Sequence, residues 1–153
     1  MMGAVTYQEP AVVKTIDELF VPVQVNTQDA ANKPILERFR QFWTPDLRVI
    51  GSDGFDYLGW NGYLPPFELV PQLLVGIARA DMRCNQEAQA VPFYEEVLRR
   101  FPTSQAAPEA QYYLAVARYK SSHEGSDLLG GWRDLRLRYP ESPWRTRQLF
   151  AEK

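Results

Sequence analysis

Residues 43–60 read WTPDLRVIGSDGFDYLGW, and this stretch decides the fold of the N-terminal half. Residues 47–50 and 55–60 carry the alternating apolar pattern of two strands. Between them, Gly-Ser-Asp-Gly supplies residue types that tolerate a tight hairpin turn. Pro45 cannot donate to a β-ladder, so we expect it just before the first strand or at its first position. The stretch therefore predicts an antiparallel β-hairpin.

The sequence before the hairpin predicts a helix, a strand and a second helix. Pro10 opens the first helix, which we expect to run to residue 20. Residues 20–26, FVPVQVN, are nearly all apolar, which is typical of a strand covered on both faces of an α/β sheet. A polar loop follows, and Pro34 lies just inside a helix whose apolar stripe extends to Trp43.

The sequence after the hairpin predicts helices alone. A helix begins at residue 67, and we expect a kink or a new helix start at Pro71, which cannot donate a backbone hydrogen bond. Apolar residues at helical spacing predict three more helices, and a short closing helix follows. These four segments cover residues 88–100, 107–119, 127–139 and 143–150, with loops at 81–87 and 120–126.

An internal repeat lies within these helices. Residues 97–104, VLRRFPTS, parallel residues 135–142, LRLRYPES, and their prolines are 38 residues apart. The pattern resembles tetratricopeptide helix pairs of bacterial envelope-assembly and scaffold proteins, whose repeat is about 34 residues. This resemblance implies a concave face that binds extended peptides, which Tyr113, Arg118 and Arg136 would line. We expect most of the other aromatic residues to pack between helices.

The N-terminal half resembles a second family. The element order, Phe20-Val21-Pro22-Val23, Thr44-Pro45 and the closing Asp53-Gly54 hairpin resemble the C-terminal two-thirds of a thioredoxin fold. The resemblance implies that the Thr44–Pro45 peptide is cis and lies against an active-site Cys-x-x-Cys. It also implies a partner-binding groove, for which the candidates are Trp43, Thr44, Pro45 and Trp60. The chain has no Cys-x-x-Cys and begins at Met1, where that motif should just have ended.

The resemblance leaves a strand missing from the sheet. In a complete thioredoxin fold, the strand before Cys-x-x-Cys lies between the strands that correspond to residues 21–26 and 47–50. Without that strand, two rows of backbone groups would be unpaired, which buried backbone groups almost never are. The strand could come from an N-terminal segment or from a second copy of the chain, or the remaining strands could pair directly. The sequence leaves these three alternatives open.

The residue types that support catalysis are scarce. Cys84 is the single cysteine, so an intramolecular disulfide is excluded, and we interpret it as a helix-end or loop residue without a function. His123 is the single histidine and cannot form a closed zinc site alone. The sequence has no phosphate-binding loop and no Gly-x-Gly-x-x-Gly motif. We expect no catalytic residue, no cofactor and no metal in this chain.

Charge and hydropathy argue against two classes of partner, nucleic acid and membrane. The net charge is −2 and no basic run is present, which argues against nucleic acid. No apolar run reaches about 18 residues, so we expect no membrane span. The N-terminus lacks the charged and apolar regions of a signal peptide, and a cytoplasmic location is the default.

Together these observations predict an α/β part followed by an all-α part. Residues 1–76 would be an incomplete thioredoxin-like domain, and residues 77–153 a tetratricopeptide-like domain that shares its opening helix, 67–80. The leading functional hypothesis is a non-catalytic interaction or scaffold module that binds a protein or peptide and forms a homodimer through the incomplete sheet. The alternatives are a thiol–disulfide oxidoreductase whose Cys-x-x-Cys lies upstream of Met1, and a chaperone-like peptide holder.

Overall fold

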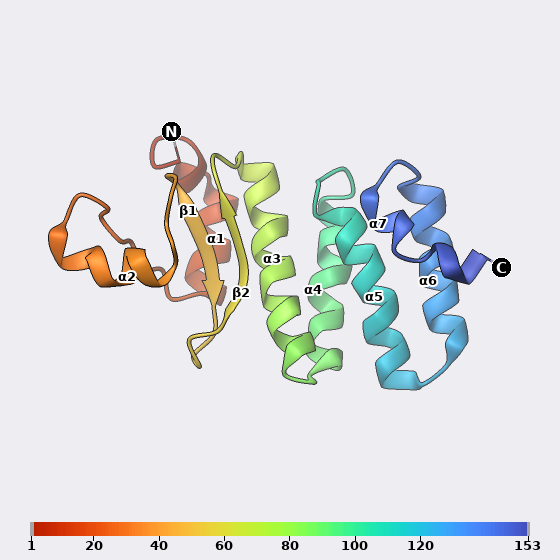
Figure 1. Ribbon diagram of the computed structural model, residues 1–153. Coiled ribbons are helices and arrows are strands. Elements are labelled where there is room, and N and C mark those ends of the chain that lie inside the picture. The colour runs from red at the N-terminus through yellow and green to blue at the C-terminus, as the bar shows by residue number, and fades with distance from the viewer. Residues whose placement is uncertain (1, 153) are drawn as a thin grey trace.

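The computed structural model describes residues 2–152, and its side chains from residue 2 to residue 150. This part of the chain is mixed α/β and mostly helical, with one two-stranded antiparallel sheet among the described residues. Figure 1 shows the elements in a row, from α2 at one end, through the hairpin and α3, to α6 and the C-terminus. In chain order they are η1 (Thr6–Gln8), α1 (Pro10–Leu19), η2 (Ala30–Asn32), α2 (Lys33–Arg38), β1 (Asp46–Ile50), β2 (Asp56–Asn61), α3 (Pro66–Arg83), α4 (Glu87–Arg100), α5 (Ala107–Ser122), α6 (Gly125–Arg138), α7 (Pro143–Thr146) and η3 (Leu149–Glu152).

The predicted hairpin is confirmed. Leu47 lies opposite Trp60 and Val49 lies opposite Leu58, and the register shifts between Val49 and Ile50. Gly54, near the end of the turn between the strands, has a φ of +78°, which residues other than glycine rarely adopt. Pro45 directly precedes β1, and the Thr44–Pro45 peptide is cis, as the thioredoxin resemblance implies.

One face of the hairpin packs on α3. Val49 is buried, and Leu47, Leu58 and Trp60 pack against the main core. A Cβ atom added to Gly76 of α3 would lie 2.8 Å from Cγ2 of Val49, so the helix approaches the strand as closely as a glycine allows. Since α1 and α4 also pack on α3, this helix joins the hairpin to the helical half.

The helices α3, α4, α5 and α6 each pack against the next one in the chain. Alanines at the contacts, among them Ala78, Ala90 and Ala117, are fully buried and let the helix axes approach closely. Tyr94 fills the space between α4 and its neighbours and is also fully buried. The two Pro-containing loops of the sequence repeat line one shared pocket of about 330 Å³, so the two repeat copies lie next to each other.

Several predicted boundaries are wrong. Residues 20–26 form no strand, because no described segment pairs with them. The helix predicted to extend to Trp43 ends at Arg38, shortly before Arg40 adopts a φ of +49°. No new helix starts at Pro71, since α3 continues through it. The helix predicted to end at residue 119 extends to Ser122, and the closing helix divides into α7 and η3.

No helix in the described part of the chain is both long and apolar enough to cross a membrane.

Candidate protein-interaction surface

The outer edge of β1 has no partner strand among the described residues. The N–H of Gly62 donates to the carbonyl of Pro45 at 2.9 Å, which marks these two residues as a hydrogen-bonded pair. Since hydrogen-bonded and non-bonded pairs alternate along an antiparallel ladder, the backbone groups of the odd-numbered residues of β1 face β2. The N–H and C=O groups of Asp46, Arg48 and Ile50 therefore face outward. We call this row of outward groups the β1 edge.

The segment of residues 20–26 is the second unpaired feature in this region. Figure 1 shows it running from the end of α1 to η2 and α2, on the β1 side of the hairpin. The side chains of Val21 and Val23 are 89% and 79% exposed, which is unusual for valine. The segment is anchored at its ends, because the N–H of Phe20 donates to Ile16 and the carbonyl of Asn26 accepts from the side chain of Asn32.

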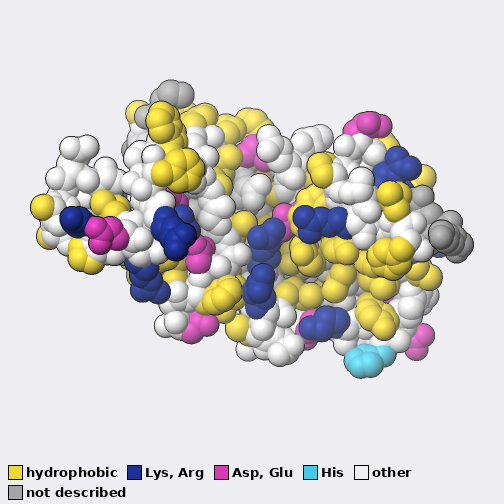
Figure 2. All heavy atoms as spheres, viewed as in Figure 1, with side chains coloured by type: hydrophobic (Ala, Val, Ile, Leu, Met, Phe, Trp, Pro, Cys, Tyr) yellow, Lys and Arg dark blue, Asp and Glu magenta, His cyan; other side chains and the backbone are white. Residues whose placement is uncertain are grey.

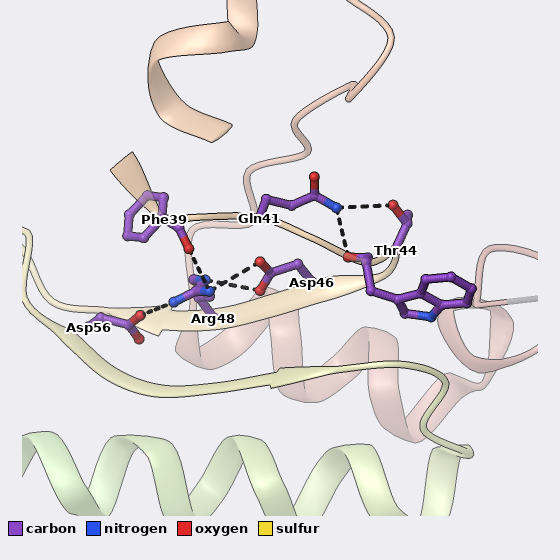
Figure 3. Close-up of polar contacts among 7 residues, drawn as sticks. Phe39, Gln41, Thr44, Asp46, Arg48 and Asp56 are labelled. Atoms are coloured by element: carbon purple, nitrogen blue, oxygen red, sulfur yellow. Dashed lines mark hydrogen bonds and ion pairs between the residues drawn. The ribbon is translucent and has the colours of Figure 1, made fainter. Parts of the chain in front are cut away.

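Two exposed aromatic residues lie between these features. Phe42 and Trp43 directly precede the cis peptide, and their side chains are 79% and 63% exposed. The loop is held in place by Gln41, whose Nε2 donates to the carbonyl of Trp43 at 2.7 Å and to Oγ1 of Thr44 at 3.3 Å (Figure 3). The aromatic side chains are therefore presented by an ordered backbone. Large apolar side chains exposed together are a common sign of an interaction surface.

A charged cluster fixes the hairpin beside this surface. Figure 3 shows the guanidinium of Arg48 between the carboxylates of Asp46 and Asp56. It bonds to both oxygens of Asp46, at 2.9 and 3.1 Å, and to the carbonyl of Phe39 at 3.1 Å, and it pairs with Asp56. The hydrogen bond to Asp46 contributes most to holding the pKa of Arg48 above its ordinary value. Arg48 thus ties both strands to the segment that follows α2.

The structure brings three of the predicted site residues together and separates the fourth. Trp43, Thr44 and Pro45 lie in succession at the start of β1, and all three are at least partly exposed. Trp60 lies opposite Leu47 and packs against the core beside α3. Val21 and Phe42, both exposed, were not among the predicted site residues, because the sequence pattern had assigned them to a buried strand and to the apolar stripe of a helix.

The three residues predicted to line a peptide groove on the helices each contact other side chains of the chain. Tyr113 contacts Tyr112 and Trp144 in an aromatic cluster, with ring centroids 5.2 and 5.4 Å apart. Arg118 pairs with Glu95 at 2.8 Å, and Arg136 bonds to Gln148 at 2.8 Å, so these two arginines contact different elements. Figure 2 shows hydrophobic side chains gathered over the α4–α6 part of this face, with Lys and Arg side chains at its borders.

The single thiol lies apart from this surface. Cys84 is exposed at the end of α3, and its Sγ lies 3.6 Å from the hydroxyl of Tyr57. This hydrogen bond is the main cause that raises the pKa of Tyr57 to about 12. His123 is exposed at the left-handed end of α5. Within the described residues, no three His, Cys, Asp or Glu side chains lie close enough together to hold a metal ion.

No protein-family model, no curated protein and no solved structure matches this chain.

Proposed function

We propose that this chain is a protein-interaction module that binds an extended protein segment by adding it as a strand to the β1 edge. One observation carries the proposal: the outward backbone groups of Asp46, Arg48 and Ile50 have no partner among the described residues, while the side chain of Arg48 bonds the strand to Phe39. An ordered, unpaired edge is a template for strand addition, since main-chain hydrogen bonds supply affinity and neighbouring side chains supply selectivity. Phe42 and Trp43 would supply the apolar contacts.

The finer fold assignments support this function. We infer that the described part of residues 1–76 is thioredoxin-like and that α3–α6, with α3 shared, are two tetratricopeptide-like helix pairs. The order of α1, α2 and the hairpin favours the first assignment. The successive packing of α3 to α6 and the shared pocket of the two proline loops favour the second. In this arrangement the helices act as a rigid support that presents the edge, because α3 belongs to both halves.

Amide hydrogen exchange tests the proposal directly. In the protein without peptide, diluted until it is monomeric so that the β1 edge is uncovered, we expect the N–H groups of Arg48 and Ile50 to exchange rapidly and that of Val49, which faces β2, to exchange slowly. The probe is a synthetic peptide of alternating Val and Thr with a Lys at each end. Its binding should slow exchange at Arg48 and Ile50, with little change at Val49.

The matched control peptide has proline in place of consecutive valine and threonine residues, so both of its edges lack N–H donors. The control should give no protection. If a saturating concentration of the Val-Thr peptide leaves exchange at Arg48 and Ile50 unchanged, strand addition at the β1 edge is wrong.

A second candidate function is thiol–disulfide exchange, and the position of the N-terminal turn favours it. Oγ1 of Thr6 donates to the carbonyl of Leu64 at 2.8 Å, and Gly62 bonds to Pro45. The residues before α1 therefore lie at the end of the hairpin where β1 begins. In a longer natural protein, a Cys-x-x-Cys just before Met2 would lie beside Thr44 and Pro45, as in the thioredoxin family.

The natural reading frame tests this second candidate. It requires an in-frame Cys-x-x-Cys two or three codons before Met1, and the corresponding protein should then reduce insulin disulfides with dithiothreitol as the electron source. Replacing the first of those cysteines by serine should abolish this activity. An upstream frame without the cysteine pair would exclude thiol–disulfide exchange by this route.

A further inference from the structure

Within the described residues, the β1 edge and residues 20–26 both lack a partner strand, and the two fit each other. We propose that residues 20–26 of one copy pair with the β1 edge of a second copy, and that the exchange is reciprocal. This inference rests on the proposed function and names its partner: a second copy of this chain. Two such pairings related by a twofold axis form a closed dimer, in which both edges are covered.

Pro22 sets which residues of the segment can pair. Proline has no N–H, so in a strand its backbone must face away from the ladder. Successive residues of a strand direct their backbone groups to opposite sides, so Val21, Val23 and Val25 would then face the β1 edge. That edge also offers three residues with outward groups. The segment and the edge therefore match in length and in the positions of their hydrogen-bonding groups.

The side chains favour a parallel pairing. In a parallel pair, a residue on one strand bonds to the two residues that flank the residue directly opposite it on the other strand. The side chains of hydrogen-bonded residues therefore point to opposite faces of the sheet, and those of directly opposite residues point to the same face. The three valines would then lie on the face of Leu47 and Val49, which packs on α3. Gln24 would lie on the polar face beside Arg48. An antiparallel pairing would instead place the valines among Asp46 and Arg48.

The conformation of the segment within one chain favours a partner in trans. Its ends are anchored to α1 and to the loop before η2, and between these anchors it forms neither helix nor strand and pairs with no strand of the described chain, its own β1 included. Val21 and Val23 are the most exposed valines among the described residues. A second copy would remove this apolar surface from water without moving the anchors.

Light scattering on a sizing column over a dilution series tests the dimer. We expect a mass twice that of the chain for the unaltered protein. The double variant Val21→Lys, Val23→Lys should be monomeric with unchanged helical circular dichroism, because its lysines would enter the apolar face. The control Leu137→Lys alters another highly exposed apolar side chain, on α6, and should stay dimeric. A monomeric unaltered protein, or a dimeric double variant, would overturn the inference.

Disulfide trapping between copies tests the orientation. In a Cys84→Ser background, we would mix one preparation carrying Gln24→Cys with another carrying Ile50→Cys. Parallel pairing places both positions on one face, so a disulfide between copies should form under mild oxidation. The matched mixture of Val23→Cys with Ile50→Cys should not form it, because these positions lie on opposite faces. The reverse result would contradict the parallel pairing.

A synthetic peptide FVPVQVN, with the sequence of residues 20–26, separates this inference from the proposed function. Added in excess, it should dissociate the dimer to monomers, and a scrambled peptide with the same composition should not. A protein that is monomeric throughout, yet whose Arg48 and Ile50 amides are protected by the Val-Thr peptide, retains the proposed function and excludes the second copy as its partner.

Discussion

The carboxylate of Glu68, in the first turn of α3, accepts the backbone N–H of Gln105 at distances of 3.0 and 3.2 Å to its two oxygens. Gln105 lies in the loop that joins α4 to α5, so this bond connects the start of the first helix pair to the start of the second. Glu68 is buried, and burial raises the pKa of its carboxyl group while the bond from Gln105 acts in the opposite direction.

Replacing Glu68 by alanine should destabilise the fold, because it leaves the N–H of Gln105 without its partner. Loss of a hydrogen bond to a charged group costs about 1.5–3 kcal/mol. Glu68→Gln keeps an acceptor oxygen on a side chain of the same length, so its free energy of unfolding should fall by less. Urea unfolding followed by circular dichroism gives both free energies. Equal losses for the two variants would show that the bond to Gln105 contributes nothing.

The same carboxyl group should make stability depend on pH. Its pKa in the folded chain lies above the ordinary value of 4.5, so the folded state holds the proton more tightly than the unfolded state. The resulting stability is fully present below pH 4.5 and is lost as pH rises through the folded pKa. Between about pH 4 and about pH 8, the unaltered protein should therefore lose stability relative to Glu68→Gln. A pH-independent difference between the two unfolding free energies would contradict this.

Gly131 and Gly130 of α6 offer a matched pair of substitutions. A Cβ at Gly131 would lie 2.5 Å from Cβ of Ala115 on α5, and a Cβ at Gly130 would meet nothing within 4 Å. Gly131→Ala should therefore force α5 and α6 apart and cost about 1–3 kcal/mol. Gly130→Ala should stabilise the helix by about 0.5–1 kcal/mol. Thermal unfolding measures both, and a stabilising Gly131→Ala would show that the two helices pack less closely.

The elements with local sequence signals were predictable from the sequence. The hairpin follows from alternation around Gly-Ser-Asp-Gly, and the four long helices follow from apolar spacing and from prolines at their boundaries. The start of α6 at Gly125 and the end of α4 at Arg100 fall within two residues of their predicted positions. The cis Thr44–Pro45 peptide was likewise predictable, because the Thr-Pro pair is a local motif.

The features that depend on distant partners were not predictable. FVPVQVN has the composition of a buried strand, yet pairing depends on a neighbouring strand that is not among the described residues. Pro71 was expected to kink a helix or to start a new one, but α3 continues through it: its missing N–H removes a single backbone bond, and its ring is fully buried. The hydrogen bond between Glu68 and Gln105 joins residues 37 positions apart, and no local sequence pattern predicts it.

The contact between Val49 and Gly76 should determine how firmly the hairpin docks on α3. Val49→Ala removes two buried methyl groups and should cost about 1–3 kcal/mol. Gly76→Ala alone should also destabilise, because its Cβ would lie 2.8 Å from Val49. In the double variant the new methyl group occupies space that the valine has left, so its loss should be smaller than the sum. Strictly additive losses in urea unfolding would show that the two residues do not contact each other.

Even a conservative substitution of Arg48 should destabilise the fold, because the contacts of this side chain depend on its planar guanidinium. It bonds to both oxygens of Asp46, to Asp56 and to the carbonyl of Phe39, and a lysine ammonium cannot reach all of these at once. Arg48→Lys should therefore cost about 1–3 kcal/mol in urea unfolding, and less at high salt, where partly exposed charges are screened.

Arg118 provides the control for this prediction. It also pairs with a carboxylate, that of Glu95, but both of these side chains are about half exposed. Arg118→Lys should therefore change the unfolding free energy by less than about 1 kcal/mol. Equal effects at the two positions would show that Arg48 acts as an ordinary surface charge. A selective effect at Arg48 would identify it as the residue that holds the β1 edge in place, and Arg48→Lys should then also speed amide exchange at Val49.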